Sequence, residues 1–186
     1  MVRHTTYIKP YGIQYRVTNM FHGISAFFSL FLIWGIVLNM SEGVSLLSMT
    51  HILILLVLTL AGTFYRDTWV FDKQEQRITS IYGFGPLCKR EQFAFSEVHQ
   101  LELNHFVRGT TDKDAKPTKR RFRAMLVFSL NLGEDEKRDI EIIAEKTSGG
   151  RTESAVQAIS AVTGLPLFVD RPRDLDLNVS YKDMKW

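Results

Sequence analysis

The sequence predicts a membrane protein of mixed α and β class. An N-terminal transmembrane hairpin of two helices precedes an antiparallel β-barrel or roll, which a C-terminal α-helix caps. Neither Lys, Arg, Asp nor Glu occurs in the 25 residues between Arg16 and Glu42, or in the 23 between Glu42 and Arg66. Beyond that point apolar and polar residues alternate, as in half-buried strands. The composition, 45% hydrophobic and 23% charged, excludes a disordered chain, and the single cysteine excludes a disulfide scaffold.

The two uncharged stretches are expected to form helices at about 19–40 and 44–65, joined by a short turn. Each supplies the roughly 20 apolar residues that a helix needs to cross a bilayer. Apolar side chains occur on all faces, which argues against a surface amphipathic helix. A signal peptide fits poorly because a second span follows at once. A buried helical pair in a soluble protein is the alternative, although the rest of the chain is too small to bury both helices.

The distribution of basic residues predicts the orientation of this hairpin. Residues 1–18, expected to be a cytoplasmic N-terminal segment, hold Arg3, Lys9 and Arg16 without an acid, and Arg66 follows the second span. The turn between the spans has no basic residue. The positive-inside rule therefore predicts a multi-pass protein of the cytoplasmic (inner) membrane with both termini in the cytoplasm. The lone Cys88 agrees with a reducing compartment.

Two histidines and several small residues lie within the predicted spans. Ionisable groups in a membrane are candidates for function. Residues at equal depth in a tight antiparallel hairpin have numbers that sum to about 84, so His22 faces Gly62 and His51 faces the level of Ile33. The histidines therefore cannot share a metal or a proton within one hairpin, and each is instead expected to bond to a carbonyl, a serine or another subunit. Gly23 and Gly62 permit close helix packing.

Alternation of period two predicts six strands in the second part of the chain. The clearest is 122–132, and the others lie at 68–71, 77–82, 91–95, 98–106 and 139–145. In the last of these, Ile140, Ile142 and Ala144 are expected to point inward. Turn residues at 72–73, 83–86 and 133–135 separate the strands.

The end of the chain predicts one helix and a tail. Residues 152–163 place Ala155, Val156, Ile159 and Val162 on one side, and Gly164 and Pro166 end the helix. The domain is therefore expected to span 66–169, as a small curved sheet closed by a helix. The tail at 170–186 is expected to fray, with strand addition to the sheet or to a partner as the alternative.

Short motifs give this layout a family resemblance. The segment that carries it best is Trp69-Val70-Phe71-Asp72-Lys73-Gln74-Glu75-Gln76-Arg77-Ile78. It resembles the opening hairpin of bacterial pleckstrin-homology-like (PH-like) domains. The step at 95–98 before a long strand and the late helix ending at 164–167 are similar too. The layout of residues 19–169 is similar to the photosystem I assembly factor family and to bacterial membrane proteins with a PH-like domain. The resemblance implies a PH-like fold, but no residue points to photosynthesis.

The sequence departs from the lipid-binding branch of that superfamily in the first hairpin. Those domains place several basic residues there to hold phosphoinositide phosphates. The turn at 72–76 instead has two acids against one base. We therefore expect no headgroup pocket at that turn.

The densest charge feature is a basic segment at 108–123 with a net charge of +5. Near an anionic inner leaflet such a segment gains about 1 kcal/mol per basic residue. An acidic partner protein and a solvated loop are the alternatives. Nucleic acid is not expected, because no aromatic residue lies between Arg108 and Arg121 to stack on bases. The candidate binding residues are Arg108, Lys113, Lys116, Lys119, Arg120, Arg121 and Arg123.

Signatures of enzymes are absent from the sequence. Gly83-Phe84-Gly85 lacks the third glycine and the helix of a phosphate-binding loop. His99 and His105 are six residues apart on one strand, about 20 Å, too far for one metal. No cysteine pair, HExxH motif or nucleophile elbow occurs. We expect no catalytic residue, no metal, no cofactor and no small-molecule substrate.

The sequence therefore favours a non-enzymatic membrane adaptor, accessory subunit or assembly factor. Its expected partners are membrane lipids and a membrane-protein complex or a second copy of the chain. The alternative is a membrane-surface sensor that binds anionic lipid through the basic segment at 108–123.

Overall fold

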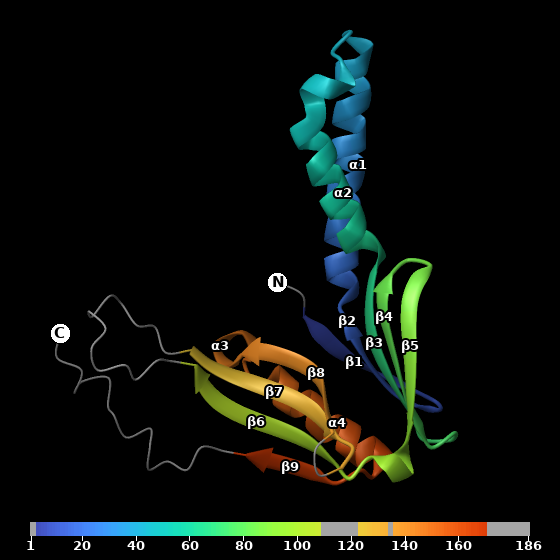
Figure 1. Cartoon of the computed structure of the whole chain (residues 1–186), viewed down its shortest axis with the longest axis vertical. Helices are drawn as coiled ribbons and strands as arrows, with labels where there is room; N and C mark the ends of the chain where they lie inside the picture. Colours follow the sequence, from blue (N-terminus) through green and yellow to red (C-terminus); the bar gives the residue numbers. More distant parts are fainter. Residues whose placement is uncertain (1–2, 109–122, 134–135, 171–186) are drawn as a thin grey trace, which may run out of the picture. The chain divides into compact units, whose positions relative to one another are not determined.

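The computed structural model describes residues 3–108, 123–133 and 136–170 (Figure 1). These residues belong to two compact units. The first unit contains the chain up to Gln74 together with Ile78–Gln92, and the second contains Glu75–Arg77 and the chain from Phe93 onward. Each unit has its own sheet and its own helices, and each is described by itself.

The first unit is built on a five-stranded sheet. Its strand order is β1 (His4–Lys9), β2 (Gly12–Val17), β3 (Tyr65–Asp72), β4 (Arg77–Phe84) and β5 (Leu87–Ala94). The β1–β2 hairpin is absent from the sequence-based prediction, which assigned no strand to residues 1–18. Alternation in β2 buries Ile13, Tyr15 and Val17 on one face of the sheet.

The helical hairpin is an insertion between two neighbouring strands of this sheet. Helix α1 (Asn19–Ser41) follows β2 after the single residue Thr18, and helix α2 (Thr50–Phe64) runs directly into β3. A short 3-10 helix, Leu46–Met49, precedes α2. Figure 1 shows α1 and α2 side by side. The strands β2 and β3 pair antiparallel from Gly12–Asp72 to Arg16–Thr68, so their residue numbers also sum to 84.

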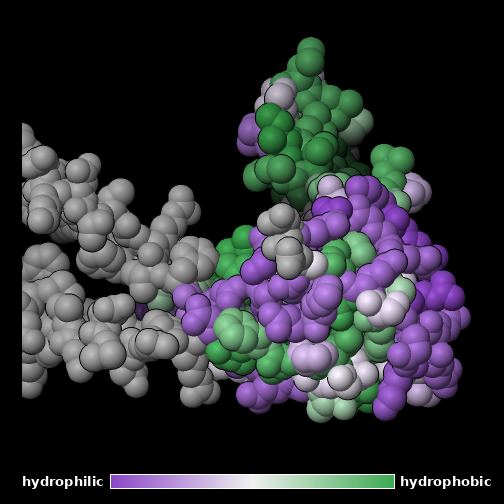
Figure 2. Space-filling model, turned by 60° about the horizontal axis from the view of Figure 1, so that its bottom comes forward, coloured by the Kyte–Doolittle hydropathy of each residue, from purple (hydrophilic) through white to green (hydrophobic). Residues whose placement is uncertain are grey.

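Both helical segments are long and apolar enough to cross a membrane. Only 11% of the most apolar window of α1, and 6% of that of Leu46–Phe64, is buried. Neither segment is therefore a core helix of the described chain, which removes the alternative of a buried pair within it. The part of the hairpin that is visible in Figure 2 is mostly apolar.

The second unit has a four-stranded sheet in the order β8 (Lys137–Ala144), β7 (Arg123–Asn131), β6 (Gln100–Arg108) and β9 (Leu167–Asp170). Strand β9 runs parallel to β6 and the other pairs are antiparallel. Helix α4 (Arg151–Thr163) packs on β6, β7 and β9, and the short α3 (Glu145–Ser148) precedes it. The core contains Leu101, Leu103, Leu126, Phe128, Leu130, Ile140, Ile143, Ala155, Val156 and Ile159.

The prediction of one closed barrel is wrong, because the strands form two separate ladders. The break follows β5, where residues Phe95–Glu97 make a 3-10 turn. The Ala94 N–H donates to the Glu97 carboxylate at 2.8 Å, and the Val98 N–H donates to the Phe95 carbonyl at 3.1 Å. Backbone N–H groups that are satisfied within a turn do not extend a ladder, so β6 begins a new sheet.

The inward direction predicted for Ile142 is also wrong. The pairs Phe128–Glu141 and Ser129–Asp139 leave Ile140 without an opposite residue, which is a β-bulge. A bulge reverses the alternation along the rest of the strand. Ile140 and Ile143 are therefore buried, whereas Ile142 is 55% exposed. In α4 the prediction is confirmed for Ala155, Val156 and Ile159, and Val162 is half-buried.

Candidate functional site

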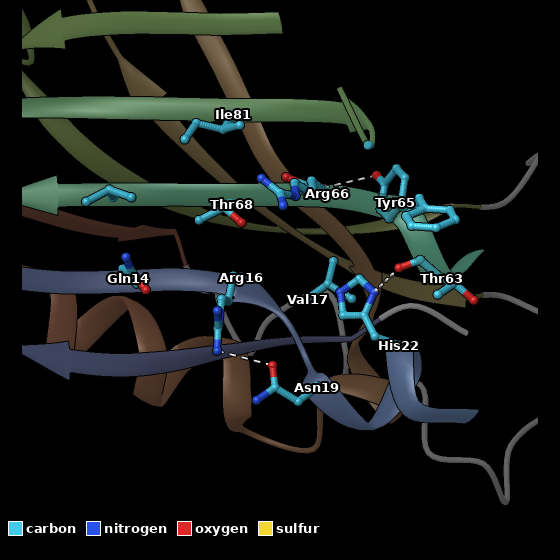
Figure 3. A pocket seen from close by; sticks show the side chains of 14 residues that line it. Gln14, Arg16, Val17, Asn19, His22, Thr63, Tyr65, Arg66, Thr68 and Ile81 are labelled. Carbon is cyan, nitrogen blue, oxygen red and sulfur yellow. Dashed lines mark hydrogen bonds between the residues drawn. The ribbon is translucent and has the colours of Figure 1, made fainter. Parts of the chain in front are cut away.

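A cavity of about 470 Å³ lies in the first unit where the helical hairpin meets the sheet (Figure 3). We call it the junction pocket. Strands β2 and β3 supply one side, and the ends of α1 and α2 supply another. Its lining residues are Gln14, Arg16, Val17, Asn19, His22, Thr63, Phe64, Tyr65, Arg66, Asp67, Thr68, Val70, Ile81 and Gly85.

Backbone hydrogen bonds hold the hairpin to the sheet on both sides of this pocket. The Thr18 N–H donates to the Arg3 carbonyl at 2.9 Å, which fixes the start of α1. The Gly85 N–H donates to the Phe64 carbonyl at 2.8 Å, so the β4–β5 turn satisfies one of the last carbonyls of α2. Gly85 has φ +53°, in the left-handed region that favours glycine. The helices therefore leave the sheet without a flexible linker.

Two arginines give the junction pocket its charge. Arg16 Nη2 donates to Asn19 Oδ1 at 3.1 Å, and its guanidinium lies 4.4 Å from the centre of the Tyr7 ring. Its Nε is fully buried and has no hydrogen-bond partner in the described part of the chain. Arg66 is exposed on β3. Within the described residues neither arginine forms an ion pair with a carboxylate.

The carboxylate of Asp67 also lines the pocket, but it is engaged with other side chains. Its Oδ2 lies 3.1 Å from His4 Nε2 and accepts a hydrogen bond from the Tyr65 hydroxyl at 3.4 Å. Burial raises the pKa of Tyr65, and the neighbouring Asp67 carboxylate raises it further. Tyr65 therefore remains a hydroxyl donor at neutral pH, and the Asp67 carboxylate contacts His4 and Tyr65 and pairs with neither arginine.

The four residues singled out within the predicted spans differ in their surroundings in the structure. His22 Nδ1 lies 3.2 Å from the Thr63 carbonyl oxygen, which confirms the expected bond to a carbonyl. Gly62 lies at the contact between the helices, since a Cβ there would stand 2.8 Å from Ser25 Oγ. Gly23 faces open space and is not needed for that contact. His51 is exposed and has no hydrogen-bond partner among the described residues.

A second charged cluster lies on the sheet of the second unit, around the buried Glu102 of β6. The Glu102 carboxylate accepts from Lys137 at 2.7 Å, Asn131 at 2.7 Å, Gln100 at 3.0 Å and Asn104 at 3.3 Å. Burial alone would raise the pKa of Glu102, but these hydrogen bonds outweigh it and lower that pKa to about 2. All four donors serve one ionised carboxylate, and no charge is left over to hold a ligand.

Most of the predicted basic segment lies outside the described residues. That holds for Lys113, Lys116, Lys119, Arg120 and Arg121. The remaining two, Arg108 and Arg123, are paired residues at the ends of β6 and β7. The two ends of the segment therefore meet, as expected for a connection between neighbouring antiparallel strands.

The described residues contain no group of three or more His, Cys, Asp or Glu side chains that could hold a metal. Cys88 is half-buried in β5, and its Sγ donates to the Gly85 carbonyl at 3.1 Å. Comparison of the chain with protein-family models, curated proteins and solved structures finds no match. The function therefore has to be inferred from the geometry of the chain itself.

Proposed function

We propose that this protein is a membrane-anchored adaptor that acts by binding and not by catalysis. In this proposal α1 and α2 cross the cytoplasmic membrane, and both termini and both sheets lie on the cytoplasmic side. The observation that carries it is the direct insertion of the hairpin between β2 and β3, with one residue on one side and none on the other. A domain joined in this way is held at the bilayer surface, where it meets neighbouring membrane proteins.

The exposed side chains of the hairpin support this placement. Large apolar residues on both helices are exposed, among them Phe27, Phe31, Trp34, Val57 and Leu58. In water such a surface is costly, at about 25 cal/mol for each Å². Lipid tails or the helices of a partner would cover it.

The β4–β5 turn supports a position at the membrane surface. It exposes Phe84 and Leu87, at 52% and 83%, and its Gly85 is bonded to the last residue of α2. Figure 1 shows this turn beside the base of α2. Exposed Phe and Leu side chains next to a helix end suit the boundary between hydrocarbon and headgroups.

The proposal includes a PH-like origin for the part of the chain after the hairpin. The β3–turn–β4 hairpin covers the segment 69–78 that carries the resemblance, and a helix follows the last antiparallel strand. The function itself rests on the anchor and its surface, because one fold hosts many functions.

The second candidate function is a sensor of anionic lipid through the segment 108–123. The pairing of Arg108 with Arg123 favours it, because it brings the two ends of the basic segment together. Neutral substitutions at Lys119, Arg120, Arg121 and Arg123 separate the candidates. Loss of binding to anionic liposomes with an intact complex supports the sensor, and the reverse supports the adaptor.

Cysteine labelling tests the membrane topology. In a Cys88→Ser background, Glu42→Cys lies in the turn between the helices and Gln74→Cys in the exposed β3–β4 turn. We expect a membrane-impermeant maleimide to label Glu42→Cys in intact cells, and Gln74→Cys only after permeabilisation. Equal labelling of both in intact cells would contradict the proposed topology.

Site-specific photocrosslinking in membranes tests the adaptor role. A photoreactive residue at Phe31, 64% exposed, is compared with one at Ser29, 3% exposed on the same helix. We expect a discrete adduct with one membrane protein from position 31 and none from position 29. Adducts with lipid alone, together with a monomeric mass in nanodiscs, would overturn the adaptor proposal for stable complexes.

A further inference from the structure

We propose that the junction pocket binds a phosphate-bearing headgroup of an anionic lipid through Arg16 and Arg66. The inference rests on the proposed membrane insertion of α1 and α2, and it adds a ligand class and a site. The pocket lies at the ends of both helices, so insertion of the hairpin would bring it to the level of the lipid phosphates.

Strand register places the two arginines at a suitable separation. Arg16 pairs with Thr68 on the neighbouring strand, and Arg66 lies two residues from Thr68 on the same face of β3. Arg16 and Arg66 are therefore diagonal neighbours, a relation in which residues lie about 7–8 Å apart and their Cβ atoms somewhat closer. Two long side chains at that spacing can converge on one phosphate. Figure 3 shows both in the lining of the pocket.

The hydrogen-bonding state of Arg16 leaves one donor for an anion. Asn19 and the Tyr7 ring hold its guanidinium in place, while the buried Nε has no acceptor among the described residues. A buried donor without a partner is costly. A phosphate oxygen would satisfy it, since arginine presents paired N–H groups in the geometry that phosphate accepts.

The start of α1 adds a second source of positive potential. Thr18, its N-cap residue, makes no side-chain capping bond, and Asn19, its first residue, lines the pocket. Unpaired N–H groups at a helix N-terminus favour an anion. The only acidic residue in the lining is Asp67, which is engaged by His4 and Tyr65. The cavity thus has two guanidinium groups and a helix N-terminus against one carboxylate, that of Asp67.

Native mass spectrometry of the full chain, released from detergent with added lipid, tests the site. The probes are phosphatidylglycerol, which is anionic, phosphatidylcholine, which is zwitterionic, and inorganic phosphate. We expect the wild-type protein to retain one phosphatidylglycerol at least about tenfold better than phosphatidylcholine. The variant Arg16→Gln/Arg66→Gln should reduce that preference to about threefold or less.

A matched control carries the same loss of charge elsewhere in the same unit. Lys73 and Arg90 are exposed and do not line the pocket, so Lys73→Gln/Arg90→Gln should keep the wild-type preference. An equal loss in both variants, or no preference in the wild type, would overturn the proposal. If the double variant fails to fold, the lipid preference of the single variant Arg66→Gln decides the test. Arg66 is exposed and makes no hydrogen bond or ion pair within the described residues, so this variant should fold.

Two further outcomes distinguish a lipid from free phosphate as the ligand and test the membrane insertion on which the proposal rests. Displacement of phosphatidylglycerol by millimolar inorganic phosphate would support the phosphate site but reject lipid as its ligand. Failure of membrane insertion is seen independently in the labelling of Glu42→Cys and Gln74→Cys. Arginine-dependent phosphate binding without insertion would reject the membrane proposal and the lipid ligand together, leaving a soluble phosphate site.

Discussion

The two units each contain a cluster of charged side chains, and the clusters differ in how their charges are satisfied. In the second unit, Glu102 accepts four hydrogen bonds, one of them from Lys137 at 2.7 Å. In the first unit, Arg16 and Arg66 have no carboxylate partner among the described residues, and Arg16 Nε has no acceptor. A satisfied buried charge stabilises the fold, whereas an unsatisfied cation at a cavity is suited to bind an anion.

This difference distinguishes a structural cluster from a binding site on the geometry of the chain alone. Around Glu102 the donors come from three adjacent strands, so the cluster joins β6, β7 and β8. Around Arg16, no carboxylate among the described residues forms an ion pair with either arginine of the pocket. Substitutions should therefore affect stability at Glu102 and ligand binding at Arg66.

The largest effect is expected for Glu102→Ala. Removal of the carboxylate leaves Asn131 and Lys137 without their acceptor, and we expect a loss of about 3 kcal/mol in the free energy of unfolding. For a chain of this size that is a decrease in Tm of about 6–12 °C, measured by differential scanning fluorimetry in detergent. The control is Glu136→Ala, the same change at an exposed position. A decrease equal to that of the control would contradict the structural role of Glu102.

The pH dependence of stability should report the ionisation of Glu102. The pKa of Glu102 is about 2 in the folded protein and 4.5 as its ordinary value. Because folding lowers this pKa, its contribution is complete above about pH 4.5 and is lost as pH falls toward 2. The shift corresponds to at most about 3 kcal/mol. We expect the Tm difference between wild type and Glu102→Gln to be constant from pH 5 to 8 and to shrink below pH 4.5. A constant difference down to pH 3 would contradict this assignment.

The sequence predicts the repetitive parts of the fold well. Long uncharged runs predict α1 and α2, and strict alternation predicts β7 within a residue of its observed bounds. The β1–β2 hairpin escaped prediction because β1 shows no clear alternation of apolar and polar residues. A signal was nevertheless present, since Ile13, Tyr15 and Val17 alternate with polar residues. The bulge at Ile140 leaves no comparable signal, because its effect depends on pairing with β7.

The junction pocket was not predicted, although the relation needed to find it was already in use. The rule that residue numbers sum to 84 was applied only inside the helical hairpin. The same sum describes the pairing of β2 with β3, from Gly12–Asp72 to Arg16–Thr68. Extended beyond the helices, it would have placed Arg16 opposite Thr68 and diagonal to Arg66. Without knowledge that 1–18 contains a strand, the two arginines served only to predict topology.

A smaller effect is expected at another satisfied cluster of the second unit. The buried Thr152 hydroxyl donates to Glu141 at 3.0 Å and accepts from Ser148 at 3.1 Å. Thr152→Val keeps the shape but removes these bonds, which should cost about 1–2 kcal/mol. Thr5→Val on the exposed side of β1 is the control. A Tm for Thr152→Val at or above that of the control would show that hydrogen bonding there is not what stabilises the unit.

The smallest change in stability is expected for Arg66→Gln, and it tests the other half of the comparison. Arg66 is exposed and makes no hydrogen bond or ion pair within the described residues, so its loss should change the free energy of unfolding by at most about 0.5 kcal/mol. A ligand that binds only the folded state raises Tm as its concentration increases. We therefore expect phosphatidylglycerol to raise the Tm of the wild type and of Lys73→Gln, and to raise that of Arg66→Gln less. A large destabilisation without lipid would instead make Arg66 a structural residue like Glu102, and the contrast between the two clusters would fail.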